Sequence, residues 1–341
     1  MAGTRRQLPF VLLAALSGAC YTGPEGAGFG DGDPRDVVMN TTALNGISLQ
    51  GISLQGISLQ GISLQGISLQ GISLQGISLQ GTVFSGFTSV NGVKTPREGT
   101  ELIGAEWTIS VQGKDKYGKN VTEQFVLRVD DIYPDPKVTD EDVLLYEMSY
   151  RPKNSQVWDA LCKNPDNSPI PAIPLNNYWD LKTGDRVDDD RVVTFACTNG
   201  VLAKCVEWGY RPWGEAWTCP KWDKPKNCDL ISLQDHHQAC TRMARADYCG
   251  TGEPWTVNGT AIDIWDHLYP QIEAREAPTW QIEAEWSPEG AECLLDIRQQ
   301  GWKAMGQYPS CPDKHRSKAK KDCGQFQDDD TLLVSAFNKP K

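Results

Sequence analysis

Cysteine and histidine are the residues of this chain whose side chains could form disulfides, bind a metal or act in catalysis. The chain has eleven Cys and four His. Cys20 stands alone, whereas the other ten Cys lie between positions 162 and 323. Ten thiols can close five disulfides, and an odd total that becomes even without Cys20 fits a chain whose Cys20 carries a lipid. The spacing leaves the pairing open. The ten disulfide candidates are Cys162, Cys197, Cys205, Cys219, Cys228, Cys240, Cys249, Cys293, Cys311 and Cys323.

Zinc is the alternative use of these side chains. Structural zinc sites usually have ligand pairs two to four residues apart, and the closest Cys pair here is Cys197 and Cys205. His236, His237 and Cys240 could form a ligand cluster. We expect disulfides instead, with no metal and no other cofactor.

Catalysis would need an acid, a base or a nucleophile placed in a pocket. The four His are His236, His237, His267 and His315. One interpretation is a hydrolase that uses His237 or His267 with a nearby Asp; the other has His237 packed inward while Arg245 and Asp247 orient a helix. The second is favoured, since the chain has no G-x-S-x-G, H-E-x-x-H, P-loop or dinucleotide motif. No catalytic residue is therefore assigned.

Binding could instead use exposed aromatic side chains. The chain has twelve Trp against eight Phe, and Trp213, Trp217 and Trp222 fall in one expected loop. These three Trp could form a surface patch. Asp188, Asp189 and Asp190 could hold calcium, but an exposed turn is the simpler interpretation.

The N-terminal segment 1–19 has the order of a secretory signal: Arg5 and Arg6, an apolar run from Leu8 to Leu16, then small residues before Cys20. The sequence LSGAC resembles a lipoprotein signal with its Leu one position too far out, and it also suits the ordinary signal peptidase. Cys20 is thus a candidate for lipidation. The Gly-, Asp- and Pro-rich stretch 20–45 predicts a flexible linker.

Residues 46–81 contain seven perfect copies of GISLQ. A period of five resembles that of pentapeptide-repeat proteins, in which each repeat forms one side of a square β-helix. The bulky Ile departs from that family's preference for a small residue. We expect a short solenoid-like extension; a strand-rich cap on the next domain and a disordered spacer are the alternatives.

Residues 82–341 predict one disulfide-rich domain of the α+β class, mainly β with one or two helices. A helix is expected from Ser232 to Cys249, with Ser232 and Asp235 forming a capping box and Gly250 as its left-handed stop. A shorter helix is expected from Gly200 to Trp208. Strands are expected at Leu102–Val111, Glu123–Val129, Val143–Tyr150, Arg191–Cys197, Trp280–Trp286 and Leu332–Phe337, and hairpin turns at Asn91-Gly92 and Thr256–Thr260.

The charge balance excludes one class of partner. The net charge is −11, and loss of the signal removes two Arg, leaving 31 basic against 44 acidic residues, or −13. Such a chain repels phosphate backbones, so we expect no nucleic acid partner. The basic run Lys314–Lys321 is short and predicts a solvated loop.

Three segments carry a family resemblance: FACTNGVLAKCVEWGYRPW from Phe195, HHQACTRMARADYCGTGEPWTVNGTAIDIWD with ADYC at Ala246, Asp247, Tyr248 and Cys249, and EWSPEGAEC ending at Cys293. Over roughly residues 100 to 325 the chain resembles the ADYC-domain family, found mostly in exported proteins of myxobacteria. The resemblance implies a secreted or lipid-anchored protein and brings no activity.

Together these features predict an exported cell-envelope protein, either an outer-membrane lipoprotein or a secreted one, that touches the membrane only through a lipid on Cys20. Its expected role is a non-catalytic binding or structural module with an envelope or extracellular partner. The alternative is a secreted hydrolase with a His and Asp pair.

Overall fold

The computed structural model describes residues 36–37, 48–49, 52–53, 62–63, 67–70, 72–114, 120–139, 142–180, 182–189, 192–219, 227–257, 259–311, 323–326 and 330–339. The predicted signal at 1–19, most of the linker at 20–45, and much of the repeat region at 46–81 lie outside these residues. So do Cys20, Asp190, Trp222, His315 and the run Lys314–Lys321.

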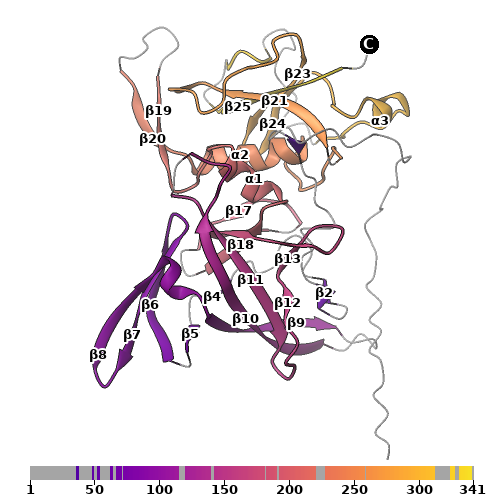
Figure 1. Cartoon of the computed structure of the whole chain (residues 1–341). Helices are drawn as coiled ribbons and strands as arrows, with labels where there is room; N and C mark the ends of the chain where they lie inside the picture. The colour runs from indigo at the N-terminus through magenta and orange to yellow at the C-terminus, as the bar shows by residue number, and fades with distance from the viewer. Residues whose placement is uncertain are drawn as a thin grey trace, which may run out of the picture.

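Two antiparallel sheets lie at opposite ends of the fold with two helices between them (Figure 1). The larger sheet has eleven strands, and β12 (Asp159–Ala160) pairs with β11 beside the main order. The main order is β4 (Ile62–Ser63), β18 (Val192–Cys197), β15 (Ala172–Asn176), β11 (Leu144–Pro152), β10 (Asn120–Pro134), β9 (Ala105–Lys114), β5 (Ile67–Leu69), β6 (Ile72–Gln80), β7 (Val83–Val90) and β8 (Val93–Glu98).

The smaller sheet has five strands, and its central strands are covered on both faces. Their order is β1 (Asp36–Val37), β21 (Thr260–Asp266), β25 (Leu333–Phe337), β23 (Gln281–Ser287) and β24 (Gly290–Leu294). Short ladders complete the fold: β2 (Ser48–Leu49) with β3 (Ile52–Ser53), β13 (Cys162–Lys163) with β14 (Pro169–Ile170), β16 (Tyr178–Trp179) with β17 (Arg186–Val187), and β20 (Asp229–Ser232) with β19 (Glu215–Thr218) and β22 (Leu268–Tyr269).

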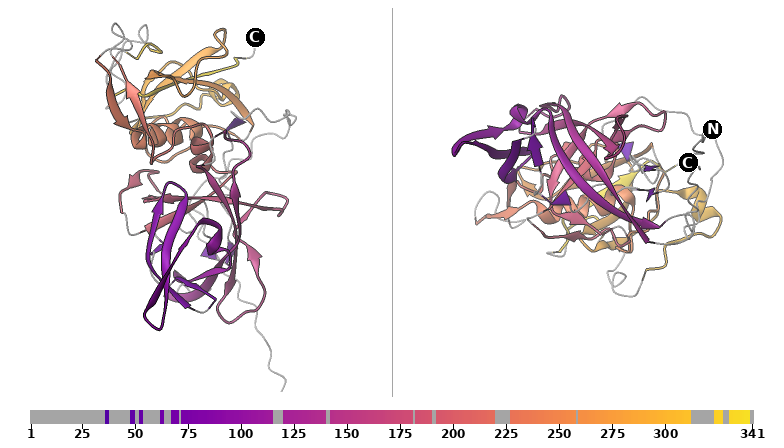
Figure 2. Two further views of the ribbon diagram at one scale, coloured as in Figure 1. Left: turned by 60° about the vertical axis from the view of Figure 1, so that its left-hand side comes forward. Right: turned by 90° about the horizontal axis from the view of Figure 1, so that it is seen from below.

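The helices confirm the predicted class. The structure is mainly β, with α1 (Val201–Glu207), α2 (Gln234–Arg245), a five-residue α3 (Gln300–Ala304) and a 3-10 turn at Gly99–Leu102. Helix α1 lies within the range expected for it. The view turned by 60° also places α1 and α2 between the two sheets (Figure 2).

Helix α2 ends four residues earlier than predicted. Ala246 takes the left-handed conformation, with φ 52° and ψ 40°, and closes the helix in place of Gly250. At the other end Leu233 is the cap residue, and the predicted capping box between Ser232 and Asp235 does not form; the Ser232 hydroxyl only accepts the Gln234 N–H at 3.2 Å.

Most predicted strands are confirmed, but one hairpin is wrong. Asn91 and Gly92 both have positive φ and join β7 to β8 as predicted. The described residues 251–257 form no strand, so β21 starts at Thr260 after a turn closed by the Thr260 N–H to the Val257 carbonyl. An extended partner for β21 is instead supplied by β25 from the end of the chain.

The described GISLQ residues join antiparallel ladders. In both β2–β3 and β5–β6, the Leu of one repeat pairs with the Ile of the next: Leu49 with Ile52, and Leu69 with Ile72. Strand β5 also pairs with β9 of the large sheet. The solenoid-like arrangement predicted for the repeats as a whole lies outside the described residues.

A period of five conflicts with the two-residue alternation of a strand, because side chains five apart face opposite sides. Leu74 and Leu79 are nevertheless both buried. The β6–β7 register shifts between Gln75 and Ser78, where Gly76 has φ +58°. This bulge adds the one residue that returns both Leu to the core face.

Candidate functional site

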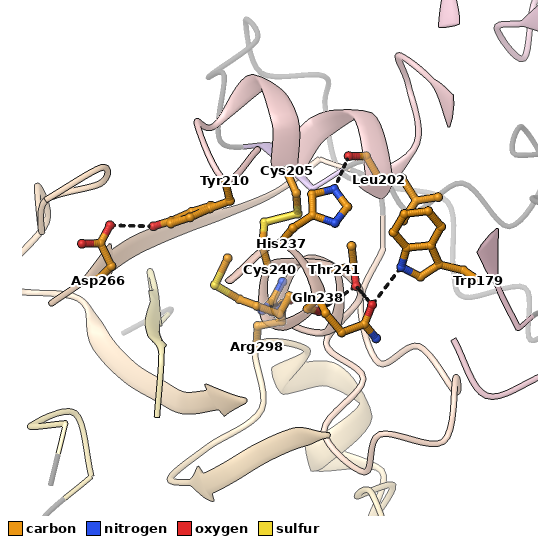
Figure 3. Close-up of a disulfide and its surroundings, with 11 residues drawn as sticks. Trp179, Leu202, Cys205, Tyr210, His237, Gln238, Cys240, Thr241, Asp266 and Arg298 are labelled. Carbon is orange, nitrogen blue, oxygen red and sulfur yellow. Dashed lines mark hydrogen bonds between the residues drawn. A yellow bond between two sulfur atoms is a disulfide. The ribbon is translucent and has the colours of Figure 1, made fainter. Parts of the chain in front are cut away.

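All ten clustered cysteines are paired. The sequence prediction of five disulfides is confirmed, with Cys162–Cys197, Cys205–Cys240, Cys219–Cys228, Cys249–Cys311 and Cys293–Cys323. Cys205–Cys240 joins α1 to α2 across the middle of the fold (Figure 3). Cys240 is therefore a disulfide sulfur and does not ligate a metal with His236 and His237.

The ADYC residues form the junction between α2 and the five-stranded sheet. Asp247 is completely buried, and its carboxylate accepts hydrogen bonds from the Thr251 N–H at 3.0 Å and the Gly252 N–H at 2.9 Å. The same carboxylate pairs with Arg242 at 2.6 Å. Asp247 thus fixes the loop after the helix to the last turn of the helix.

Arg242 gathers three separate segments around the junction. Its guanidinium donates to Asp247, to the Thr183 carbonyl at 2.5 Å and to the Pro288 carbonyl at 2.9 Å, and it also pairs with Asp185. The side chain is 1% exposed. These hydrogen bonds and ion pairs are what make burial of such a charge tolerable.

Tyr248 enters a second buried network under the sheet. Its hydroxyl donates to Glu283 at 2.5 Å, and Arg298 holds both carboxylate oxygens of Glu283 at 2.6 and 2.7 Å. The Ser335 hydroxyl donates to Glu283 at 2.7 Å and accepts from the Trp286 indole at 2.9 Å. Burial, together with Glu283, raises the pKa of Tyr248 well above its ordinary value, so this hydroxyl remains a donor.

Cys249 and Gly250 complete the junction. Cys249 is bonded to Cys311, which ties the loop to the chain beyond α3. Gly250 has φ +63°, and a Cβ there would lie 1.7 Å from the Glu289 carbonyl oxygen. The motif therefore fixes α2 to the neighbouring loop and sheet through a disulfide, an ion pair and close packing.

His236 and His237 lie in the interior instead of an open cleft. His236 and His237 are 1% and 0% exposed, and the His237 Nε2 faces the Leu202 carbonyl oxygen at 3.1 Å (Figure 3). Burial lowers the pKa of His236 to about 3 and that of His237 to about 4. His267 is half-buried beside His236, with ring centres 6.5 Å apart. The structure therefore brings neither His237 nor Asp247 to a surface pocket.

Glu285, Cys293 and Cys323 are the described group whose donor atoms lie close enough to suggest a metal site. Both sulfurs are spent in a disulfide, however. One Glu285 oxygen accepts the backbone N–H groups of Gly324, Gln325 and Phe326 at 2.8, 2.8 and 2.9 Å. Glu285 therefore anchors the loop that carries Cys323. Asp188 and Asp189 belong to a turn in which Asp188 is exposed and pairs with Arg186.

Three of the exposed apolar residues lie together on the small sheet β20–β19–β22. Trp217 lies in register with Leu230 on one side and Tyr269 on the other, and directly opposed residues share a face. Their exposed fractions are 49% for Leu230, 48% for Trp217 and 41% for Tyr269. These three residues are called the apolar row below. Trp213 is half-buried nearby and packs against the core.

A groove of about 410 Å³ opens beside the apolar row, and Trp213, Trp217 and Tyr269 line it. Arg211 and Asp142 form an ion pair at its edge at 2.8 Å. Cys219–Cys228 joins the residues that directly follow β19 and precede β20. The predicted patch thus includes Trp217 and, in part, Trp213.

The fold and its disulfides define the class of the protein. It is a disulfide-rich α+β domain in which a helical layer separates two antiparallel sheets. The chain belongs to the ADYC-domain family, whose model matches residues 99–300. No curated protein and no solved structure shows a match to it. Within the described residues, no helix is long and apolar enough to cross a membrane.

Sequence reasoning missed Glu283, Arg298, Leu230 and Tyr269. A strand with alternating acids predicts a solvent face, so the burial of Glu283 had no local signal. Leu230 and Tyr269 become neighbours of Trp217 only through the pairing of β20 and β22 with β19. In the sequence, the hydrophobic pair Leu230-Ile231 is the local signal that could have indicated β20.

Proposed function

We propose that this protein is an exported cell-envelope protein whose ADYC domain is a non-catalytic binding module, with the groove beside the apolar row as its binding surface. The observation that carries the proposal is the state of Trp217. It is 48% exposed, flanked by two exposed apolar partners, and mounted on strands whose ends are joined by a disulfide.

Single exposed apolar side chains are ordinary, but contiguous patches of them mark interaction sites. Fixing such a patch on paired strands lowers the entropy lost on binding. The five disulfides support an oxidising location, since cytoplasmic thiols are kept reduced. The composition of residues 1–19 and the position of Cys20 support export with a lipid anchor.

In this proposal the predicted linker at 20–45 and the GISLQ repeats at 46–81 connect the anchor to the domain, and the described linker residues Asp36–Val37 pair with β21 of the smaller sheet. Among the described repeat residues, β4, β5 and β6 belong to the large sheet, where they pair with β18, β9 and β7 respectively.

The test is retention of the purified oxidised chain by washed envelope fragments. We expect the wild type to sediment with the fragments and Trp217→Ala to remain in solution. Tyr308→Ala is the matched control, because Tyr308 is an aromatic residue with 39% exposure that does not line the groove. Equal sedimentation of wild type and Trp217→Ala would refute the groove as the binding surface.

Mass spectrometry of the native chain tests the location independently. A lipid on Cys20 is expected, together with a mass ten hydrogens below that of the fully reduced chain, for the five disulfides. Free thiols at these positions in the natively exported chain would contradict the proposal.

A further inference from the structure

The apolar row has a defined extent. Its three side chains come from directly paired positions on neighbouring strands, which lie about 4.8 Å apart, so the row spans about 10 Å. Trp217 is at its centre, and Tyr269 reaches the groove beside it. A ligand with a flat, weakly polar face of this size would cover the row.

The polar groups of the groove restrict the ligand further. Among the described residues that line it, Arg211 is the one cation, and Asp142 already neutralises it at 2.8 Å. Glu215 is exposed two positions before Trp217 on the same face of β19. The rim thus carries two acids and one base, a balance that repels phosphate and carboxylate ligands.

A purely apolar ligand fits poorly for a different reason. Covering the rim with an acyl chain would remove water from the Arg211–Asp142 pair and from Glu215 without replacing their hydrogen bonds. The occupant must therefore offer hydroxyl or amide groups at its edges while presenting C–H groups to the rings.

We propose that the groove binds a neutral saccharide chain, and this inference rests on the proposed function. The C–H groups on one face of a sugar ring carry partial positive charge and meet the negative faces of Trp217 and Tyr269. Ring hydroxyls both donate and accept, so they can satisfy Glu215 and the Arg211–Asp142 pair together.

A proline-rich peptide is the competing occupant of an aromatic groove. Proline has no backbone N–H, so such a segment offers mainly carbonyl acceptors. The rim of this groove is itself dominated by acceptors, the carboxylates of Asp142 and Glu215. Sugar hydroxyls match that rim, and proline carbonyls do not.

The experiment is calorimetric titration of the full oxidised chain with four probes: cellohexaose, N-acetylchitohexaose, a decaproline peptide and phosphatidylcholine vesicles. We expect saturable binding of at least one hexasaccharide and none of the peptide or the vesicles. Trp217→Ala should weaken saccharide binding by about tenfold or more, as for a central aromatic anchor. Tyr308→Ala should bind as the wild type does.

Three results would overturn the inference: no binding of either hexasaccharide, equal binding by Trp217→Ala, or Trp217-dependent binding of decaproline or vesicles. Glu215→Gln distinguishes a saccharide from a purely apolar ligand. The loss of charge should weaken the binding of a hydroxyl-bearing ligand severalfold, whereas the apolar area of the groove stays unchanged. If envelope fragments retain the wild type but not Trp217→Ala while both saccharides fail, the ligand class is wrong and the proposed function stands.

Discussion

Removing the Asp247 carboxylate should destabilise the domain more than removing any exposed acid. In Asp247→Ala the Thr251 and Gly252 N–H groups lose their acceptor, and Arg242 loses its buried partner at 2.6 Å. An orphaned buried donor costs about 1–3 kcal/mol, and breaking a buried ion pair costs about 3–5 kcal/mol. These costs overlap, and Arg242 keeps Asp185, so we expect a loss of about 4 kcal/mol.

Asp188→Ala is the matched control. Asp188 also pairs with an arginine, Arg186 at 2.9 Å, but its side chain is 67% exposed. Exposed pairs contribute less than about 1 kcal/mol, so the two variants should differ by about 3 kcal/mol. The same residue type and the same kind of partner leave burial as the main difference between the two sites.

The assay is urea denaturation at pH 7 with the disulfides intact, followed by tryptophan fluorescence. Asp247→Ala should lower the midpoint strongly with an unchanged slope, since the surface exposed on unfolding stays the same. Asp247→Asn keeps an oxygen for one of the two N–H groups and should lose about half as much; it also gives a measurement if the Ala variant does not fold. A loss for Asp247→Ala no larger than for Asp188→Ala would refute the role given to the carboxylate.

Three other variants check the same structure. Tyr248→Phe should cost about 1–2 kcal/mol in the same assay, because Glu283 loses a buried donor while the ring stays in place. Gly250→Ala should unfold the domain or lower its yield sharply, since the new Cβ meets the Glu289 carbonyl at 1.7 Å; wild-type stability would contradict this. Burial lowers the pKa of His236 from 6.5 to about 3, so the unfolded chain takes up the proton first. The contribution of His236 to the unfolding free energy should be constant above pH 6.5 and should fall toward pH 3 by up to about 1.4 kcal/mol per pH unit, and His236→Phe should remove this contribution.

Local signals predicted the elements that depend on local chemistry. Runs of β-branched and aromatic residues predicted β9, β10, β11 and β18, and the Asn91-Gly92 pair predicted the turn between β7 and β8. The even count of clustered cysteines predicted that all would pair. Which cysteine bonds to which depends on the packing of distant segments, and the spacing holds no trace of it.

The errors have a common cause in tertiary packing. The alternation of apolar and polar residues along Gln281–Ser287 predicts that one face of the strand is exposed to solvent. Glu283 and Glu285 are nevertheless both buried, because Arg298 and the backbone of 324–326 supply hydrogen-bond partners from other parts of the chain. Ala246 takes a left-handed conformation that sequence rules assign to glycine, and its complete burial between α2 and the sheet holds it there.

The residues of the family motif lie in the helix–sheet junction, apart from the proposed binding groove. Ala246, Asp247 and Tyr248 are all 0% exposed, and the Cys249 sulfur is bonded to Cys311. The three buried residues cannot touch a ligand without unfolding the junction that the motif forms. The motif residues thus serve the helix–sheet junction, whereas in the proposed function the ligand contacts Trp217 and its neighbours, which the junction leaves on the surface. Substitutions in the apolar row should then change binding at almost constant stability, and substitutions in the motif should change stability first.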